Sequence, residues 1–244
     1  MEVAKFLFIA VCGGIVVQML TRRWTRLERQ IATLSVGAHA VSAIAQELVY
    51  RILYGGGGDM FLYQRYGAIL DRYMEIQPGG VLDVFALLFQ TDPDPFPFYV
   101  IGAGSSTGSM SALAGLITAW ISNELYVTGA LIGMFAAVGT VLFYSALRDE
   151  IPPRVRRNAA LAMFLLPSVV FWSSSLAKEA VVASGLGLAV FGIQRLLVRR
   201  QLASGAHNQS HGAAGQLTSN EEALDAEDRQ AKSGRHDGFL GQGR

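Results

Sequence analysis

The stretch YVTGALIGMFAAVGTVLFYSAL, residues 126–147, contains no charged side chain. A transmembrane helix needs roughly 17–25 mostly apolar residues, and this stretch supplies them in one run. Similar runs occupy residues 4–20 and 180–198. The whole chain is 51% hydrophobic and only 16% charged, whereas a soluble domain carries about 25% charge. The sequence therefore predicts an all-α, polytopic membrane protein and excludes an ordinary cytosolic enzyme or a disordered chain.

Two weaker runs complete the expected bundle of five spans. Residues 31–54 form a less apolar run that includes His39, Gln46 and the pair Glu47 and Arg51, which we expect to form an ion pair at i, i+4 spacing. Residues 159–174 form the other. Residues 108–122 are apolar but short, which favours an interfacial helix. The predicted transmembrane domain is thus 1–202, with an outer loop at 55–107 and an interfacial helix at 108–122.

Arginine clusters predict the orientation of these spans. Four arginines lie within residues 22–29, three within 154–157 and two at 199–200, and Arg148 follows the third span. All of them fall on one side of the membrane only if residues 108–122 do not cross it. By the positive-inside rule this side is the cytoplasmic one, so the N-terminus, the long loop and residues 175–179 are expected outside.

The ends of the chain and its composition limit the remaining classes. The n-region of the first run has only Lys5, and no small-residue cleavage site precedes Thr21, so we expect a retained span rather than a signal peptide. The single cysteine excludes a disulfide framework, and the net charge of +1 gives no indication of a nucleic-acid partner. From Ala203 onward the chain is polar and rich in Gly, Ser and Gln, which predicts a disordered tail over 203–244.

Two polar motifs stand out on the predicted outer side. In the first, four glycines precede Asp59, which is followed by Tyr63 and Arg65. It is neither a P-loop nor a dinucleotide fingerprint, since no Gly-Lys-Ser/Thr follows and no βαβ unit is present. The helical pattern after Asp59 leaves two roles open for this residue: a helix N-cap or a functional acid.

The second motif runs from Pro167 through Phe171-Trp172-Ser-Ser-Ser to Lys178-Glu179. Phe171 and Trp172 suit a membrane interface, and Lys178 with Glu179 falls at the turn between two spans. One interpretation is a snorkelling lysine and a helix-starting acid. The other is a cation that binds a lipid-linked phosphate, beside a carboxylate that orients the substrate or acts as general base.

Together these motifs resemble the GT-C-type membrane glycosyltransferases of bacterial surface-polysaccharide assembly. The resemblance rests on Gly-Gly-Asp59 with Tyr63, on Ser105-Ser106-Thr107 before an apolar segment, and on Phe171-Trp172-Ser-Ser with Lys178-Glu179, and it covers residues 31–200. It implies a polyprenyl-phosphate-linked sugar donor, transfer at the outer face of the bacterial inner membrane, and a first-loop acid that activates the acceptor or holds a divalent metal.

We therefore assign Asp59 as the candidate catalytic residue and Tyr63, Arg65, Lys178 and Glu179 as candidate substrate-binding residues, with no metal-ligand set assigned. Members of this group have about twice as many spans, so we expect a truncated product or one half of a two-part assembly. Two hypotheses stay open: a glycosyltransferase-like enzyme, or a non-catalytic scaffold or partner subunit of the same envelope pathway. A transporter is the weaker third, because polar residues do not line several spans.

Overall fold

The computed structural model describes residues 1–89 and 96–198, so the predicted polar tail at 203–244 lies outside the described residues. All regular structure in the described residues is helical, which confirms the all-α prediction. The chain divides into two units, residues 1–192 and 193–244, and the description below concerns the first. The helices are α1 (Glu2–Leu20), α2 (Arg26–Leu53), α3 (Asp59–Ile76), α4 (Gly80–Leu87), α5 (Ser106–Trp120), α6 (Leu125–Leu147), α7 (Pro153–Leu165), α8 (Pro167–Trp172) and a last helix, Lys178–Val198.

Three of these helices are long and apolar enough to span a membrane: α1, α6 and Lys178–Val198. They match the three strongest runs of the sequence to within two residues at each end. Both the sequence and the structure therefore support association of this chain with a membrane.

The two weaker runs fold differently from the three strong ones. Helix α2 is long enough to cross a bilayer, but its polar content keeps it below the hydropathy of the other three. The run at residues 159–174 is not one helix, because it is divided between α7 and α8. Pro167 has no N–H to continue the helical ladder and disfavours α conformation in the residue before it. Leu166 accordingly has an extended backbone (φ −61°, ψ 120°).

Helix α2 turns its polar side chains inward. Four of them are buried at helical spacing: Ser35, His39, Ser42 and Gln46. The Nδ1 of His39 lies 2.8 Å from the Ser35 carbonyl oxygen and its Nε2 lies 3.0 Å from Ser173 Oγ. The opposite side of the helix is apolar and exposed, as Val41 (67% exposed) and Ile52 (69%) show. The helix thus presents its polar side chains, together with buried apolar residues such as Val36 and Ala40, to its neighbours, and large apolar side chains to the surroundings.

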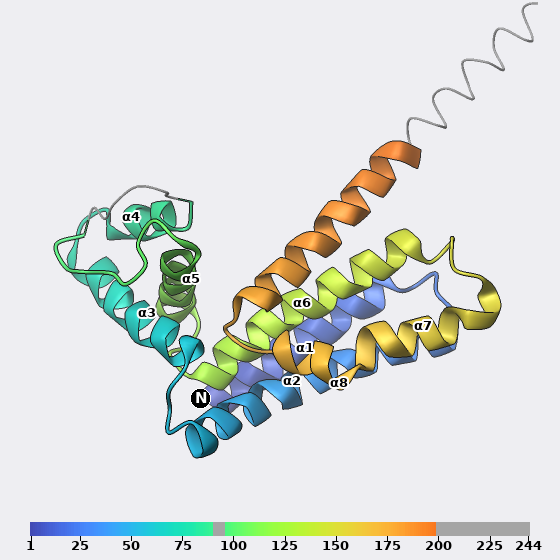
Figure 1. The fold of residues 1–244 in the computed structure, drawn as a ribbon, viewed down its shortest axis with the longest axis horizontal. Helices are drawn as coiled ribbons and strands as arrows, with labels where there is room; N and C mark the ends of the chain where they lie inside the picture. Colours follow the sequence, from blue (N-terminus) through green and yellow to red (C-terminus); the bar gives the residue numbers. More distant parts are fainter. Residues whose placement is uncertain (90–95, 199–244) are drawn as a thin grey trace, which may run out of the picture. The chain divides into compact units, whose positions relative to one another are not determined.

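Contacts at the two ends of α6 define the direction of its neighbours. At the end of α6, Arg148 bonds Glu28 at the start of α2, so these two helices run antiparallel. At its start, Tyr126 stacks on Phe6 of α1, so α1 runs parallel to α6. The Tyr144 hydroxyl lies 3.2 Å from the carbonyl oxygen of Arg156 on α7, so α7 also begins at the far end. Figure 1 shows α1, α2, α6 and α7–α8 lying side by side.

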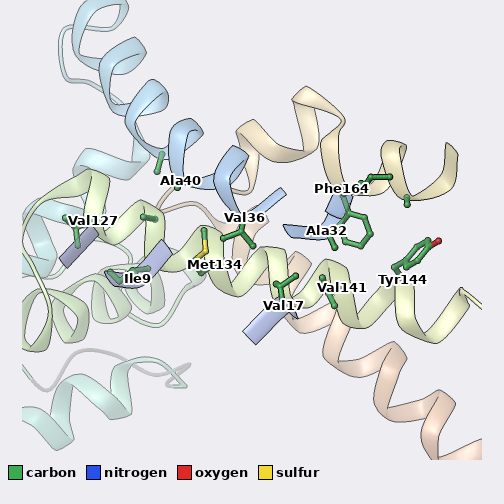
Figure 2. Packing of buried hydrophobic residues seen from close by; sticks show 14 residues of the cluster. Ile9, Val17, Ala32, Val36, Ala40, Val127, Met134, Val141, Tyr144 and Phe164 are labelled. Atoms are coloured by element: carbon green, nitrogen blue, oxygen red, sulfur yellow. The ribbon is translucent and has the colours of Figure 1, made fainter. Parts of the chain in front are cut away.

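Small and branched side chains fill the space between these helices. The buried cluster in Figure 2 joins Val17 of α1, Val36 of α2, Val141 and Tyr144 of α6 and Phe164 of α7. The Tyr144 ring also meets the ring of Trp24, with their centroids 4.9 Å apart. This cluster reaches the helix ends where the arginines gather.

A buried carboxylate lies at the end of the bundle where the arginines gather. Glu28 is 3% exposed and caps α2 together with Thr25. Its Oε2 accepts a hydrogen bond from Arg148 Nη2 at 2.9 Å, and its Oε1 accepts one from the Tyr144 hydroxyl at 2.9 Å. Burial alone would raise the pKa of Glu28, but the hydrogen bonds from Arg148, Thr25 and Tyr144 outweigh it and lower the pKa to about 2.

The predicted outer loop, residues 55–107, is largely helical. Helices α3, α4 and α5 pack on one another, and a Cβ built on Gly67 of α3 would lie 2.8 Å from the Ala114 Cβ of α5. The short apolar helix predicted at 108–122 is α5, which begins two residues earlier because the Ser105 hydroxyl accepts a hydrogen bond from the Thr107 N–H (3.2 Å). The ends of α3 and α5 nearest the bundle pack against α6 and Leu176.

Candidate functional site

A cavity of about 510 Å³ brings the two polar motifs together. Its walls come from the end of α2, the glycine turn, the start of α3, the end of α8 and the start of the last helix. Four of the five predicted site residues line it: Asp59, Tyr63, Lys178 and Glu179. The volume falls within the range of about 300–1,000 Å³ that small-molecule sites occupy.

Asp59 is presented to the cavity by a glycine turn. The helix N-cap is Gly58, so Asp59 is the first helical residue and the N-cap role for its side chain is wrong. Gly58 has a φ of 113°, and a Cβ built on it would lie 2.9 Å from Tyr50 Cε1, so no other residue suits this position. The Asp59 side chain is exposed, and the buried Tyr63 directs its hydroxyl to Asp59 Oδ2 at 3.4 Å.

Lys178 opens the last helix and faces the same cavity. Its Nζ donates to Thr107 Oγ1 at 3.3 Å, and none of the described residues forms an ion pair with it. A lysine at a helix N-terminus lies where the helix dipole disfavours a cation. A bound anion would relieve that repulsion and pair with the ammonium group, so the arrangement suits a phosphate.

Side chains that sequence reasoning did not single out complete the cavity. Tyr50 and Tyr54 stack with ring centroids 5.0 Å apart, and both line it with Trp172 and Ser175. Thr107 contributes through its contact with Lys178. The two tyrosines lie one helical turn apart directly before the glycine run. This spacing is the sequence signal that could have placed both of them beside Asp59. The sequence predicted Trp172 to lie at the membrane interface. It lines the cavity because the chain reverses direction at residues 173–177.

Arg65 does not line this cavity. Its side chain is exposed on α3, six residues after Asp59. At about 100° per residue, this spacing places it well away from the side of the helix that carries Asp59 and Tyr63. Two further acids of the predicted outer loop, Asp92 and Asp94, lie outside the described residues.

No group of three or more His, Cys, Asp or Glu side chains that could hold a metal ion occurs within residues 1–89 and 96–198. Asp59 and Glu179 are the carboxylates that line the cavity. The cavity thus offers one cation, two carboxylates and four aromatic rings, beside the N-termini of α3 and of the last helix. Comparison of the chain with known protein families, characterised proteins and solved structures finds no match.

Proposed function

We propose that this chain is a glycosyltransferase-like integral membrane protein that takes a polyprenyl-phosphate-linked sugar into the cavity between α2, α3 and the last helix. One observation carries the proposal: Asp59, Tyr63, Lys178 and Glu179, from segments more than a hundred residues apart, line one cavity. The partners would be the membrane lipid and the lipid-linked sugar, with no nucleic acid.

Each side chain has a task in that reaction. Lys178 neutralises the phosphate that links the sugar to its lipid, because it lacks a carboxylate partner of its own among the described residues. Asp59 accepts the proton of the acceptor hydroxyl as general base, and the Tyr63 hydroxyl orients it. The aromatic rings of Tyr50, Tyr54 and Trp172 offer apolar faces for the sugar ring and the first units of the lipid.

A divalent metal is compatible with this set. Mg²⁺ is commonly held by one or two carboxylates together with substrate phosphates. Asp59 and Glu179 would be those carboxylates, and the metal would further neutralise the phosphate.

We further propose five crossings of the bacterial inner membrane with the cavity at the outer face. The alternating directions of α1, α2, α6 and α7–α8 support this proposal, because consecutive crossings must alternate. The inward polar stripe of α2 supports its inclusion, since polar groups of membrane helices face protein. The cavity lies at the ends of these helices opposite to Arg148 and the arginine-rich turn.

The test measures donor binding and transfer separately in the purified full-length chain. The donor is a synthetic polyprenyl-phosphate hexose labelled in the sugar, and transfer of the hexose to water or to an added soluble hydroxyl acceptor, with polyprenyl phosphate as the leaving group, is read as release of label from the lipid. We expect Asp59→Asn to abolish transfer and leave donor binding within about twofold. We expect Lys178→Gln to weaken donor binding about tenfold or more, because a phosphate loses its one paired cation.

Two variants serve as matched controls. Lys5→Gln removes a lysine that already pairs with Glu2 at 2.8 Å, and Glu75→Gln removes an acid far from the cavity lining. Both should leave binding and transfer unchanged. Transfer that survives Asp59→Asn contradicts the role of Asp59, and donor binding that survives Lys178→Gln contradicts the phosphate site.

A second candidate function is a partner subunit in cell-envelope polysaccharide assembly. It is favoured by the last helix, Lys178–Val198, whose apolar window is only 6% buried. A helix whose side chains are mostly exposed offers a surface to another membrane protein. This candidate predicts neither donor binding nor transfer by the isolated chain, with both appearing when a membrane partner is present.

A further inference from the structure

A second polar site lies at the arginine end of the bundle, away from the outer cavity. There α1 and α2 enclose a shallow groove of about 580 Å³. Its lining is apolar along α1 and basic at its end, and it consists of Val11, Gly14, Ile15, Gln18, Met19, Arg22, Arg29 and Thr33. None of these residues lines the outer cavity.

The two arginines of the groove have no acidic partner within residues 1–89 and 96–198. The nearest acid in sequence is Glu28, and it is already engaged by Arg148, Thr25 and Tyr144. Glu28 forms no ion pair with Arg29 next to it. Two more arginines, Arg23 and Arg26, stand in the same turn. The groove thus ends in an uncompensated cluster of positive charge.

The dimensions of the groove match one leaflet of a bilayer. Val11 and Leu20, the last residue of α1, are nine residues apart, which at 1.5 Å per residue spans about 14 Å, and Arg22 lies in the turn that follows. Half of a hydrocarbon core of about 30 Å is about 15 Å. When Arg22 and Arg29 lie at headgroup level, the apolar lining therefore reaches to the middle of the membrane. The position of Gly14 is open, because a Cβ built there would meet no atom within 4 Å.

We propose that this groove binds one anionic phospholipid of the leaflet on the arginine side. Its phosphate lies between Arg22 and Arg29, whose planar guanidinium groups suit phosphate oxygens. One acyl chain runs along α1 past Gly14 towards Val11. Basic pockets between membrane helices bind anionic lipid headgroups for this reason.

The opposite half of α1 provides an internal contrast. A second apolar groove there has Lys5 at its polar end, with Ile9 and Cys12 deeper and Met134 of α6 across from them. Lys5 is paired with Glu2 at 2.8 Å, so the cation of this groove already has an acidic partner. The preference for an anionic lipid is thus confined to the arginine groove. It does not depend on the function proposed for the outer cavity.

Native mass spectrometry of the full chain in detergent tests the proposal. The probes are phosphatidylglycerol and phosphatidylcholine with identical acyl chains, and glycerol 3-phosphate as a headgroup without chains. We expect one phosphatidylglycerol to bind at least tenfold more tightly than phosphatidylcholine, and glycerol 3-phosphate to bind no more tightly than inorganic phosphate. The double change Arg22→Gln with Arg29→Gln should remove the preference.

Matched variants separate a site from general attraction to positive charge. Arg23→Gln with Arg26→Gln removes the same charge from the same turn without touching the groove, and should keep at least half of the preference. Gly14→Leu fills the groove and should weaken phosphatidylglycerol binding about tenfold. Gly185→Leu, at another open helical position, should leave it unchanged.

Three results would overturn the proposal. An equal loss of the preference for phosphatidylglycerol in the two double-arginine variants would show diffuse electrostatic attraction. Binding unaffected by Gly14→Leu would show that no chain occupies the groove. Glycerol 3-phosphate that competes as well as the lipid would show a soluble phosphate site. Because the outer cavity is unchanged in every variant, none of these outcomes bears on the glycosyl-transfer assay.

Discussion

Replacing Glu28 by Gln should loosen the arginine end of the bundle by a measurable amount. In the folded chain the pKa of Glu28 falls from its ordinary value of 4.5 to about 2. At about 1.4 kcal/mol per pH unit, this difference corresponds to about 3 kcal/mol of stability at neutral pH. The change also leaves Arg148, which is 16% exposed, without its closest carboxylate. We therefore expect Glu28→Gln to lower the free energy of unfolding by about 3 kcal/mol at pH 7.

The pH dependence has a definite sign. Because the folded-state pKa is the lower one, the stabilisation is complete above about pH 4.5. It is lost as the pH falls from about 4.5 towards 2, where the carboxylate takes up a proton. The wild-type chain should lose stability over this range faster than Glu28→Gln, so that the two converge near pH 2.

Trp24 provides the readout, because its ring lies 4.9 Å from Tyr144 and 6.1 Å from Phe164 at this end. Unfolding is followed by tryptophan fluorescence in mixed micelles as the share of dodecyl sulfate rises. Both other tryptophans, Trp120 and Trp172, are replaced by Phe in every protein compared.

The matched control is Glu75→Gln, which breaks the exposed pair of Glu75 with Arg72 (54% and 74% exposed). Exposed pairs contribute about 0–1 kcal/mol, so this variant should stay close to the wild type. If Glu28→Gln costs no more than Glu75→Gln, or keeps the wild-type slope below pH 4.5, the argument from buried hydrogen bonds is wrong.

Two further predictions concern the bundle as a whole. A Cβ built on Gly187 would collide with the carbonyl oxygen of Gly139, so Gly187→Leu should cost about 1–3 kcal/mol in the same unfolding assay, whereas Gly185→Leu should be nearly neutral. In a Cys12→Ser background, an impermeant maleimide should label Glu75→Cys on intact cells and Asp149→Cys only after permeabilisation, and the reverse pattern would contradict the proposed orientation.

Long, mostly apolar runs explain why three helices could be predicted closely. Residues 4–20, 126–147 and 180–198 differ from α1, α6 and Lys178–Val198 by at most two residues at either end. Length and composition decide such helices, because every turn is apolar. The prediction of a single helix over residues 159–174 was wrong, although the sequence of this run contains Pro167. There the backbone restriction of one proline outweighs the hydropathy of the window.

The candidate site was predictable only in part, for geometric reasons. Asp59 and Tyr63 share a helical side, and Lys178 with Glu179 falls at a turn on the same side of the predicted membrane, so topology brought them together. Arg65 belonged to the same motif in sequence, but helical rotation carries it away from the cavity. The contact of Thr107 with Lys178 joins positions 71 residues apart and has no local signal.

Helix α2 shows where hydropathy alone misleads. An average over the helix counts Ser35, His39 and Gln46 against a membrane location, although all three are buried against protein. What lipid would meet is the other side, where Val41 and Ile52 are about two-thirds exposed. A soluble helix exposes its polar side chains, whereas α2 buries Ser35, His39 and Gln46 among small apolar residues and exposes large apolar side chains on its other side. In water this arrangement would leave large apolar side chains hydrated for no gain, so the orientation of its side chains argues for lipid around α2 more strongly than its mean hydropathy argues against it.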